Sequence, residues 1–246
     1  MVIVLLTALG VGGATAIGAL IGFCFKNLSY KFSNVITSFA AGIMLSAAVL
    51  GLIIPSLETG GKYKLIITII GIFVGASCLN LMDRFVPHIH KLTGKTENEN
   101  FNKVLLFVFA IAIHNLPEGI AAGVGFGSDS TAQALTIAGG IALQNIPEGM
   151  VIIAPMLNAG ISKRKTLVYA LLTGLVEVIG TFIGYFAVSI SVVILPFALA
   201  FAGGTMLYVI SDEMIPETHS KGKQCGSTYA LLVGFCLMLV MDVLLA

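Results

Sequence analysis

Charged side chains are scarce in this sequence. Of its 246 residues, 10% are charged and 57% are hydrophobic, whereas a soluble domain averages about 25% charged and roughly 45–50% apolar residues. A soluble protein of this composition would aggregate through its surface. The formal net charge is +1, so nothing in the composition indicates nucleic-acid binding, which needs a basic face. The composition therefore indicates an integral membrane protein whose surroundings are lipid.

Motifs that would indicate other classes of protein are also missing. The four cysteines form no CxxC pair, so neither a disulfide framework nor a zinc knuckle is expected. No HExxH sequence is present, and an intramembrane metalloprotease would need those zinc ligands and that glutamate. The N-terminus has no basic lead, so its apolar run is interpreted as a first membrane span and not as a cleaved signal peptide. We expect a protein that is not an enzyme.

Long apolar runs dominate the chain, and a helix needs about 20 mainly apolar residues to cross the hydrocarbon core. Dividing these runs at polar or Gly/Pro breaks predicts a single all-α transmembrane domain over residues 1–246. Its eight predicted spans are residues 2–25, 33–57, 64–82, 104–127, 132–158, 166–189, 191–214 and 227–246. Only Ser189 and Ser191 divide the sixth span from the seventh, although Pro196 suits the first turn of a helix that begins there.

Basic residues segregate between the two ends of these spans. When alternate loops are assigned to opposite sides, eleven Lys and Arg fall on one side and two, Lys62 and Lys64, on the other. Cytoplasmic loops collect Lys and Arg, so the pattern predicts a multi-pass protein of the cell membrane with both termini outside the cytoplasm. The polar loop 83–102 is then cytoplasmic. Its His88 and His90 belong either to a solvated linker or to a loop that collects metal.

Carboxylates in the middle of apolar spans are the most informative residues. Glu118, Glu148 and Glu177 lie near the centres of the predicted fourth, fifth and sixth spans. A carboxylate there costs about 2.5–3.5 kcal/mol on insertion scales. No Lys or Arg lies near the centre of any span, so no basic side chain is available to pair with them. They are therefore either protonated or balanced by a bound cation.

One motif occurs twice, in successive predicted spans. Residues 114–119 read His-Asn-Leu-Pro-Glu-Gly, and residues 144–149 read Gln-Asn-Ile-Pro-Glu-Gly. In each copy the first residue and the glutamate are four residues apart and share a helix face, which the asparagine borders. Each proline removes a backbone donor and is expected to kink the fourth or fifth helix. Broken helices inside a membrane are tolerated where they line a cavity, and there they often coordinate ions.

Carboxylates, amide oxygens and one imidazole in this arrangement suit a divalent metal ion. An imidazole favours zinc, iron and similar ions over calcium or magnesium, so His114 is interpreted as a ligand and not as a structural histidine. If Glu118 and Glu148 face each other, they can bridge two metal ions. Glu177 would then add a third carboxylate.

The doubled Asn-x-Pro-Glu-Gly motif, the eight spans and the His-containing loop resemble the ZIP family of metal-ion transporters, in particular its bacterial, GufA-like branch. The similarity covers nearly the whole chain and includes Ala-Ala-Gly-Ile-Met-Leu-Ser-Ala-Ala in the second span and the segment 203–219. It implies transport of divalent transition-metal cations into the cytoplasm, with zinc or a related ion as the transported substrate. Members of this family are also thought to slide one helix bundle against another.

The resemblance implies two neighbouring metal sites halfway across the membrane. The first would use Met44, His114, Glu118, Gln144 and Glu148. The second would use Asn115, Asn145 and Glu177, with Glu118 and Glu148 bridging the two ions. Many family members have histidine where Gln144 stands, so strict specificity for zinc is not expected here. Some relatives have aspartate at the position of Asn145.

Further acidic residues stand at the predicted ends of the spans. Asp212, Glu213, Glu217 and His219 follow the seventh span and form either a water-exposed acidic helix end or a place where metal is released. Glu58, at the outer end of the second span, is a candidate to attract cations. Small-residue patterns near the N-terminus permit close helix packing within one chain or in a homodimer. The expected partners are thus metal ions, membrane lipid and, in one alternative, a second copy of the chain.

Two other functions use the same residues. A metal-selective channel also lines its path with carboxylates, and saturation of flux at low substrate concentration would favour a carrier over it. A membrane metal sensor would bind without transport, so intact uptake by His114→Ala or Glu118→Ala would support a sensor. The sequence leaves open zinc, iron, manganese, cobalt and cadmium as the physiological ion, and it leaves open coupling to protons.

The neutral Asn145 removes one negative charge from the second implied site, so we predict that this site holds metal weakly or only modulates the first. The substitution Asn145→Asp restores the charge and should raise metal affinity and change transport. Binding titration and uptake, measured on the same purified variant, check this. The interpretation fails if both stay unchanged.

Overall fold

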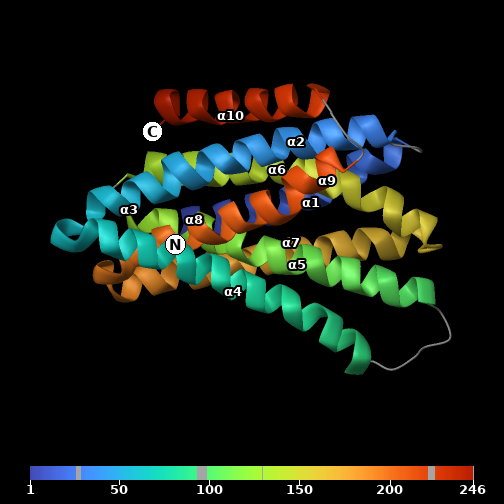
Figure 1. The fold of residues 1–246 in the computed structure, drawn as a ribbon, viewed down its shortest axis with the longest axis horizontal. Coiled ribbons are helices and arrows are strands. Elements are labelled where there is room, and N and C mark those ends of the chain that lie inside the picture. Colours follow the sequence, from blue (N-terminus) through green and yellow to red (C-terminus); the bar gives the residue numbers. More distant parts are fainter. Residues whose placement is uncertain (26–28, 93–98, 129, 221–224, 246) are drawn as a thin grey trace.

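The computed structural model describes residues 1–25, 29–92, 99–128, 130–220 and 225–245, but not the side chains of residues 83, 85–92, 99–107, 110 and 192. The described residues form helices only, and most of these run along one common direction (Figure 1). In chain order the helices are α1 (Val2–Cys24), α2 (Tyr30–Ser46), η1 (Ala47–Ile53), α3 (Ile54–Thr59), η2 (Gly61–Tyr63), α4 (Lys64–Leu92), α5 (Glu99–Val124), η3 (Gly125–Gly127), α6 (Thr131–Asn158), α7 (Lys163–Ile190), η4 (Val192–Ile194), α8 (Leu195–Val209), η5 (Ile210–Met214), α9 (Ile215–His219) and α10 (Cys225–Leu245).

Within the described residues, seven helical segments are long and apolar enough to cross a membrane. They are Val2–Cys24, Tyr30–Thr59, Gly61–Met82, Thr131–Asn158, Lys163–Ile190, Leu195–His219 and Cys225–Leu245. Many large apolar side chains point outward, with Val193 and Ile190 exposed by 88% and 83%. Such a surface is stable only against lipid. The expectation of an all-helical integral membrane protein is therefore confirmed.

Serine residues begin three of these helices. The side chains of Ser29, Ser130 and Ser162 each accept a hydrogen bond from the backbone N–H three residues further on. Such caps satisfy donors that the first helical turn leaves unpaired. Between α6 and α7 the chain turns at Gly160, whose φ of 81° is a conformation that favours glycine. Pro196 lies in the first turn of α8, as the sequence predicted.

Two of the spans contain a π-helical segment that ends just before a proline. η1 precedes Pro55 and η5 precedes Pro216, and in both the residue before the proline donates to the carbonyl five residues back. A proline lacks the N–H of the normal ladder and its ring crowds the carbonyl four residues earlier. Widening the helix by one residue relieves both effects. π-segments often lie at functional sites, and η5 carries Asp212 and Glu213.

Two helix boundaries differ from those that the sequence predicted. The polar segment 83–102 was expected to be a loop, but α4 continues as a helix to Leu92 and α5 begins at Glu99. The seventh span does not end at residue 214, because the helix continues through η5 and α9 to His219. Both extensions are polar, and hydropathy alone does not distinguish a polar helix in water from a loop.

The helices form two groups by their closest packing. In the first group α5 packs on α7, and α1 packs on both α6 and α7. In the second group α4 packs on α8, and α2, with η1 and α3, packs on α10 and α8. Glycines allow backbone contact inside each group. Gly18 lies against the Ile146 carbonyl and Gly174 against the Gly12 carbonyl in the first group, and Gly42 lies against the Leu231 carbonyl in the second.

Contacts between the two groups are made by side chains. Gly51 of η1 faces Ile137 of α6, and Gly140 of α6 faces the sulfur of Met238 in α10. Wherever a described glycine lies against a backbone carbonyl of another helix, the two helices belong to the same group. Backbone contact at glycine is the close packing of membrane helices. Each group is therefore packed more closely inside than it is against the other.

The backbone contact at Gly18 predicts that Gly18→Ala destabilises the protein. Its new Cβ would overlap the Ile146 carbonyl, and overpacking of this kind costs about 1–3 kcal/mol of unfolding free energy. Gly13→Ala, on the same helix, is the matched control because nothing lies within 4 Å of its added Cβ. Unfolding of both variants in detergent measures the difference, and equal stability would contradict the packing described here.

Candidate metal centre

The residues of the doubled motif converge where α5, α6 and α7 meet α1. Asn115 and Glu118 come from α5, Gln144 and Asn145 from α6, and Glu177 from α7, and all five are fully buried. The glycines that follow the motif glutamates allow α5 to approach α7 closely and α6 to approach α1 closely. Gly119 lies against the Glu177 carbonyl and Gly149 against the Thr15 carbonyl, so any larger residue would push α5 and α6 away from their partners.

Glu177 accepts hydrogen bonds from three other helices. Its Oε1 atom accepts from Thr15 Oγ1 of α1 at 3.0 Å and from Asn115 Nδ2 of α5 at 2.5 Å. Its Oε2 atom accepts from Asn145 Nδ2 of α6 at 2.6 Å. The same Asn145 amide donates to the backbone carbonyl of Val11 at 3.2 Å. Three donors can stabilise a carboxylate at a depth where no basic side chain reaches it.

Glu118 has a single hydrogen-bond donor among the described residues. Its Oε1 atom accepts from Gln144 Nε2 at 2.8 Å, so the glutamate of the first motif copy is joined to the first residue of the second copy. Its other oxygen, Oε2, is buried and has no hydrogen-bond partner among the described residues. One carboxylate oxygen of the motif is therefore available to a ligand.

The amide oxygens of the motif are also available to a ligand. Asn115 Oδ1, Gln144 Oε1 and Asn145 Oδ1 are buried and, like Glu118 Oε2, accept no hydrogen bond from the part of the chain that the structure describes. Leaving one buried polar group unpaired costs about 1–3 kcal/mol, and four such oxygens gather here. Carboxylate and amide oxygens are ligands for hard and borderline divalent cations.

A cavity of about 300 Å³ borders this centre. His114, Asn115 and Glu148 line it from α5 and α6, and Glu213 and Glu217 line it from η5 and α9. His114 Nε2 lies 2.7 Å from Glu213 Oε1, which joins the first helix group to the second. The cavity therefore connects the imidazole and one motif carboxylate to the acidic end of the seventh predicted span.

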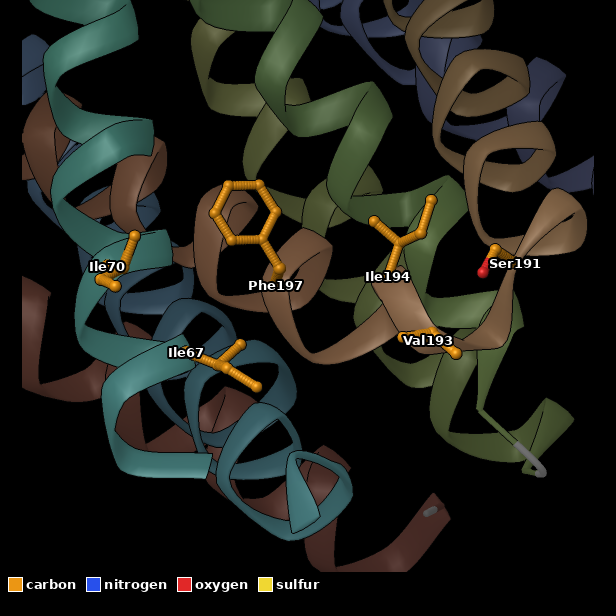
Figure 2. Close-up of a pocket in the computed structure, with 6 residues that line it drawn as sticks. All are labelled: Ile67, Ile70, Ser191, Val193, Ile194 and Phe197. Carbon is orange, nitrogen blue, oxygen red and sulfur yellow. The ribbon is translucent and has the colours of Figure 1, made fainter. Parts of the chain in front are cut away.

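A second cavity, of about 350 Å³, has a different character (Figure 2). Ile67 and Ile70 of α4 lie across it from Ile194 of η4 and Phe197 of α8. Ser191 is the one polar residue in its lining. It holds no group that could bind a metal ion, so the candidate centre is the cavity of His114 and Glu148.

The structure brings some of the other predicted residues to the centre and leaves others away from it. Met44 is fully buried within the main hydrophobic cluster. Asp212 and Glu58 are exposed, and His219 Nε2 lies 3.3 Å from the Thr228 hydroxyl. The side chains of His88 and His90 lie outside the described residues. Of the predicted release cluster, only Glu213 and Glu217 line the cavity.

Acidic and imidazole groups alone do not complete a metal site here. Among the described residues, no group of three His, Cys, Asp or Glu side chains is arranged to hold an ion. A cation bound in this conformation would therefore depend on the amide oxygens as well. Amide ligands make the site harder than a site of imidazoles and thiolates.

Thr15 is the functional candidate that sequence reasoning missed. It lies on α1, which has no place in the motif, and its hydroxyl reaches Glu177 across 162 positions of sequence. The one signal available was a hydroxyl in the middle of a predicted span that also contains Thr7. A threonine can also satisfy itself by bonding its own helix, so this signal was ambiguous.

A helical membrane protein with a buried, oxygen-lined polar centre is the class that the fold and these residues define. Residues 99–242 match the family model described as ZIP Zinc transporter. The chain is 38% identical over 246 residues to the zinc transporter GufA of Myxococcus xanthus, with 97% of each chain covered. It is 34% identical to the zinc transporter ZIPB of Bordetella bronchiseptica, covering 93% of this chain and 77% of that protein. It is 33% identical to the zinc transporter ZupT of Chlorobaculum parvum, covering 93% and 92%.

This chain belongs to the ZIP family of metal-ion transporters. The resemblance drawn from the doubled motif is thereby confirmed, and the similarity to GufA agrees with the bacterial branch expected from the sequence.

The unpaired Glu118 oxygen predicts that Glu118→Gln weakens metal binding. Glutamine keeps the shape of the side chain but has no negative charge and one oxygen fewer. We therefore expect the affinity for Zn²⁺ to fall at least about tenfold, because the loss of a residue that only hydrogen-bonds to a metal ligand already has an effect of this size. Glu58→Gln is the control, because Glu58 is exposed at the end of α3. Calorimetric titration in detergent measures both, and an unchanged affinity in Glu118→Gln would exclude Glu118 as a ligand.

Proposed function

We propose that this protein carries divalent transition-metal ions, zinc first among them, across the cell membrane into the cytoplasm. The observation that carries the proposal is the group of four buried oxygens without hydrogen-bond partners among the described residues, gathered in the doubled motif. The cavity of His114 and Glu148 lies beside them. The names of the relatives, all zinc transporters, support zinc as a substrate.

The proposed topology has eight spans in one domain. α5 joins the seven apolar segments as the eighth span, and its Pro117 and the Pro147 of α6 each remove one helical donor and would bend the helix there. Both termini lie at the end of the molecule where α3 also lies (Figure 1). We assign that end to the outside, because Lys163, Arg164 and Lys165 begin α7 at the opposite end.

The proposed site has a first and a second part. The first takes Glu118, Gln144, Glu148 and His114 as ligands, with Met44 of the second helix group beside them. The second takes Asn115 and Asn145 and shares Glu118 and Glu148 with the first. Both Glu177 oxygens already accept hydrogen bonds in the described conformation. The second part is therefore the weaker of the two, in keeping with the neutral charge of Asn145.

The described conformation suits a carrier that faces the cytoplasm. Glu217 of α9 lines the cavity and is exposed, and the proposed topology places α9 on the cytoplasmic side. Toward the other side the residues of the central cluster are apolar and fully buried, among them Leu52, Ile137 and Ile141. A channel needs a path that is continuous when open, whereas a carrier closes one side while the other is open.

Movement of one helix group against the other would expose the centre to the outside. The hydrogen bonds of the centre join α1, α5, α6 and α7, so they all lie within the first group. Contacts with the second group are side-chain contacts, including the one between His114 and Glu213. The centre can thus move as a unit without breaking its own hydrogen bonds.

Uptake by the purified protein in vesicles tests the proposed function. A panel of Zn²⁺, Fe²⁺, Mn²⁺, Co²⁺ and Cd²⁺ should show flux that saturates at low concentration, as binding to a carrier requires. Glu118→Ala and His114→Ala should abolish it. Flux that rises without saturation would instead favour a channel, and metal binding without any flux would favour a sensor.

The contact between His114 and Glu213 generates a separate prediction. In Glu213→Gln the side chain keeps its size but loses the charge that faces His114, so metal leaving the centre meets a weaker acceptor. We expect a several-fold lower maximal rate of uptake with little change in the concentration for half-maximal uptake. Asp212→Asn is the matched control, because the neighbouring Asp212 is exposed and absent from the cavity lining. A normal maximal rate in Glu213→Gln would contradict a role in release.

A further inference from the structure

Thr15 is held in a fixed position beside the centre. The residue is fully buried, and its carbonyl lies against Gly149, the residue that follows the second motif glutamate. One turn earlier, Gly12 of α1 lies against the Gly174 carbonyl of α7. These two backbone contacts fix α1 against both α6 and α7. The hydroxyl of Thr15 consequently has little freedom and donates to Glu177 Oε1 at 3.0 Å.

Glu177 in turn determines which way two amides face. Asn115 and Asn145 both donate their NH₂ groups to Glu177. An ionised carboxylate only accepts hydrogen bonds, so each amide must present its nitrogen to Glu177 and its oxygen elsewhere. Both amide oxygens are buried without a hydrogen-bond partner among the described residues. The amide oxygens are therefore aimed by Glu177 and are free to bind a ligand.

We infer that Thr15 is a positioning residue of the metal centre, which acts through Glu177 to hold the Asn115 and Asn145 oxygens toward a cation. In the described conformation both Glu177 oxygens accept hydrogen bonds, and through these bonds Glu177 orients the two amides. The inference rests on the proposed function, since it concerns the second part of the proposed site. The cation that this part takes is a hard divalent ion such as Mn²⁺, because its ligands are amide and carboxylate oxygens without an imidazole.

Three substitutions separate the hydroxyl of Thr15 from its packing. Thr15→Val keeps the shape of the side chain and removes only the donor, while Thr15→Ser keeps the donor and removes a methyl group. Thr181→Val is the matched control. Thr181 is also fully buried and also bonds Glu177, but its hydroxyl donates to the backbone carbonyl at 2.9 Å and not to the carboxylate.

Initial rates of Mn²⁺ and Zn²⁺ uptake into vesicles are the measurement. In Thr15→Val the KM for Mn²⁺ should rise about tenfold, the effect of losing one hydrogen bond to a charged group. The KM for Zn²⁺ should rise less, because the first part of the site retains its imidazole. Maximal rates should stay within about twofold of wild type, since the loss is one of ground-state binding. Thr15→Ser should restore the wild-type KM values, and Thr181→Val should leave them unchanged.

Several results would overturn the inference. It is wrong if Thr15→Val transports Mn²⁺ with a wild-type KM, or if the KM values for Mn²⁺ and Zn²⁺ rise equally. It is also wrong if Thr15→Ser and Thr181→Val lose transport together with Thr15→Val, because the role would then be packing. If Thr15→Val fails to fold, Thr15→Ser is the test. A positioning hydroxyl predicts a wild-type ratio of the KM values for Mn²⁺ and Zn²⁺ in Thr15→Ser, and a changed ratio would contradict the inference.

The wild-type protein distinguishes this inference from the proposed function. If wild-type vesicles take up no divalent ion, the proposed function fails. If wild-type vesicles transport divalent ions but Thr15→Val and Thr15→Ser have the same KM values, only the positioning role of Thr15 fails. Titration of Mn²⁺ binding to detergent-solubilised wild type and Thr15→Val gives a second readout without flux, and the same loss of about tenfold is expected there.

Discussion

The structure depends on how buried carboxylates are compensated where no basic side chain can reach them. Glu118, Glu148 and Glu177 lie on adjacent helices of one group, and each finds a different environment. Glu177 accepts from three protein donors, Glu118 accepts from one, and Glu148 lines the cavity of His114. Transfer of an uncompensated charge from water to an apolar interior is very unfavourable. The oxygens of Glu118 and of the amides that accept no hydrogen bond from the described residues are therefore the atoms that a bound cation would stabilise most.

This compensation explains the close packing of the first helix group. The donors to Glu177 come from α1, α5 and α6, so these helices must converge on α7. Gly12, Gly119 and Gly174 permit the contacts of α1 and α5 with α7, and Gly149 permits the contact of α6 with α1. Among the described residues, the second group carries no part of the hydrogen-bond network around Glu177. It shares the apolar cluster on one side of the centre with the first group, and it contributes Glu213 on the other side. A site built within one group, against a partner that touches it through side chains, is suited to alternating access.

Much of the fold followed from local properties of the chain. Runs of apolar residues located the spans, Pro196 marked the beginning of α8, and the doubled motif located the polar centre on α5 and α6. Each of these signals concerns one segment and its cost of insertion into lipid. The polar extensions of α4 and α9 were missed, because a helix that leaves the membrane has no apolar period to reveal it. The π-segments before Pro55 and Pro216 were missed as well, since proline predicts a disturbed ladder but not how it is relieved.

The sequence by itself determined the membrane class, the order of the apolar segments, the family and the chemical types of the candidate ligands, because insertion energy and motif spacing are properties of neighbouring residues. Only the tertiary structure decided which carboxylate is capped by donors and which oxygens stay open. It also decided that Glu213 and Glu217, and not Asp212 or His219, line the cavity. The partners of Glu177 lie 162, 62 and 32 positions away along the chain. Their meeting depends on helix packing, which no local pattern specifies.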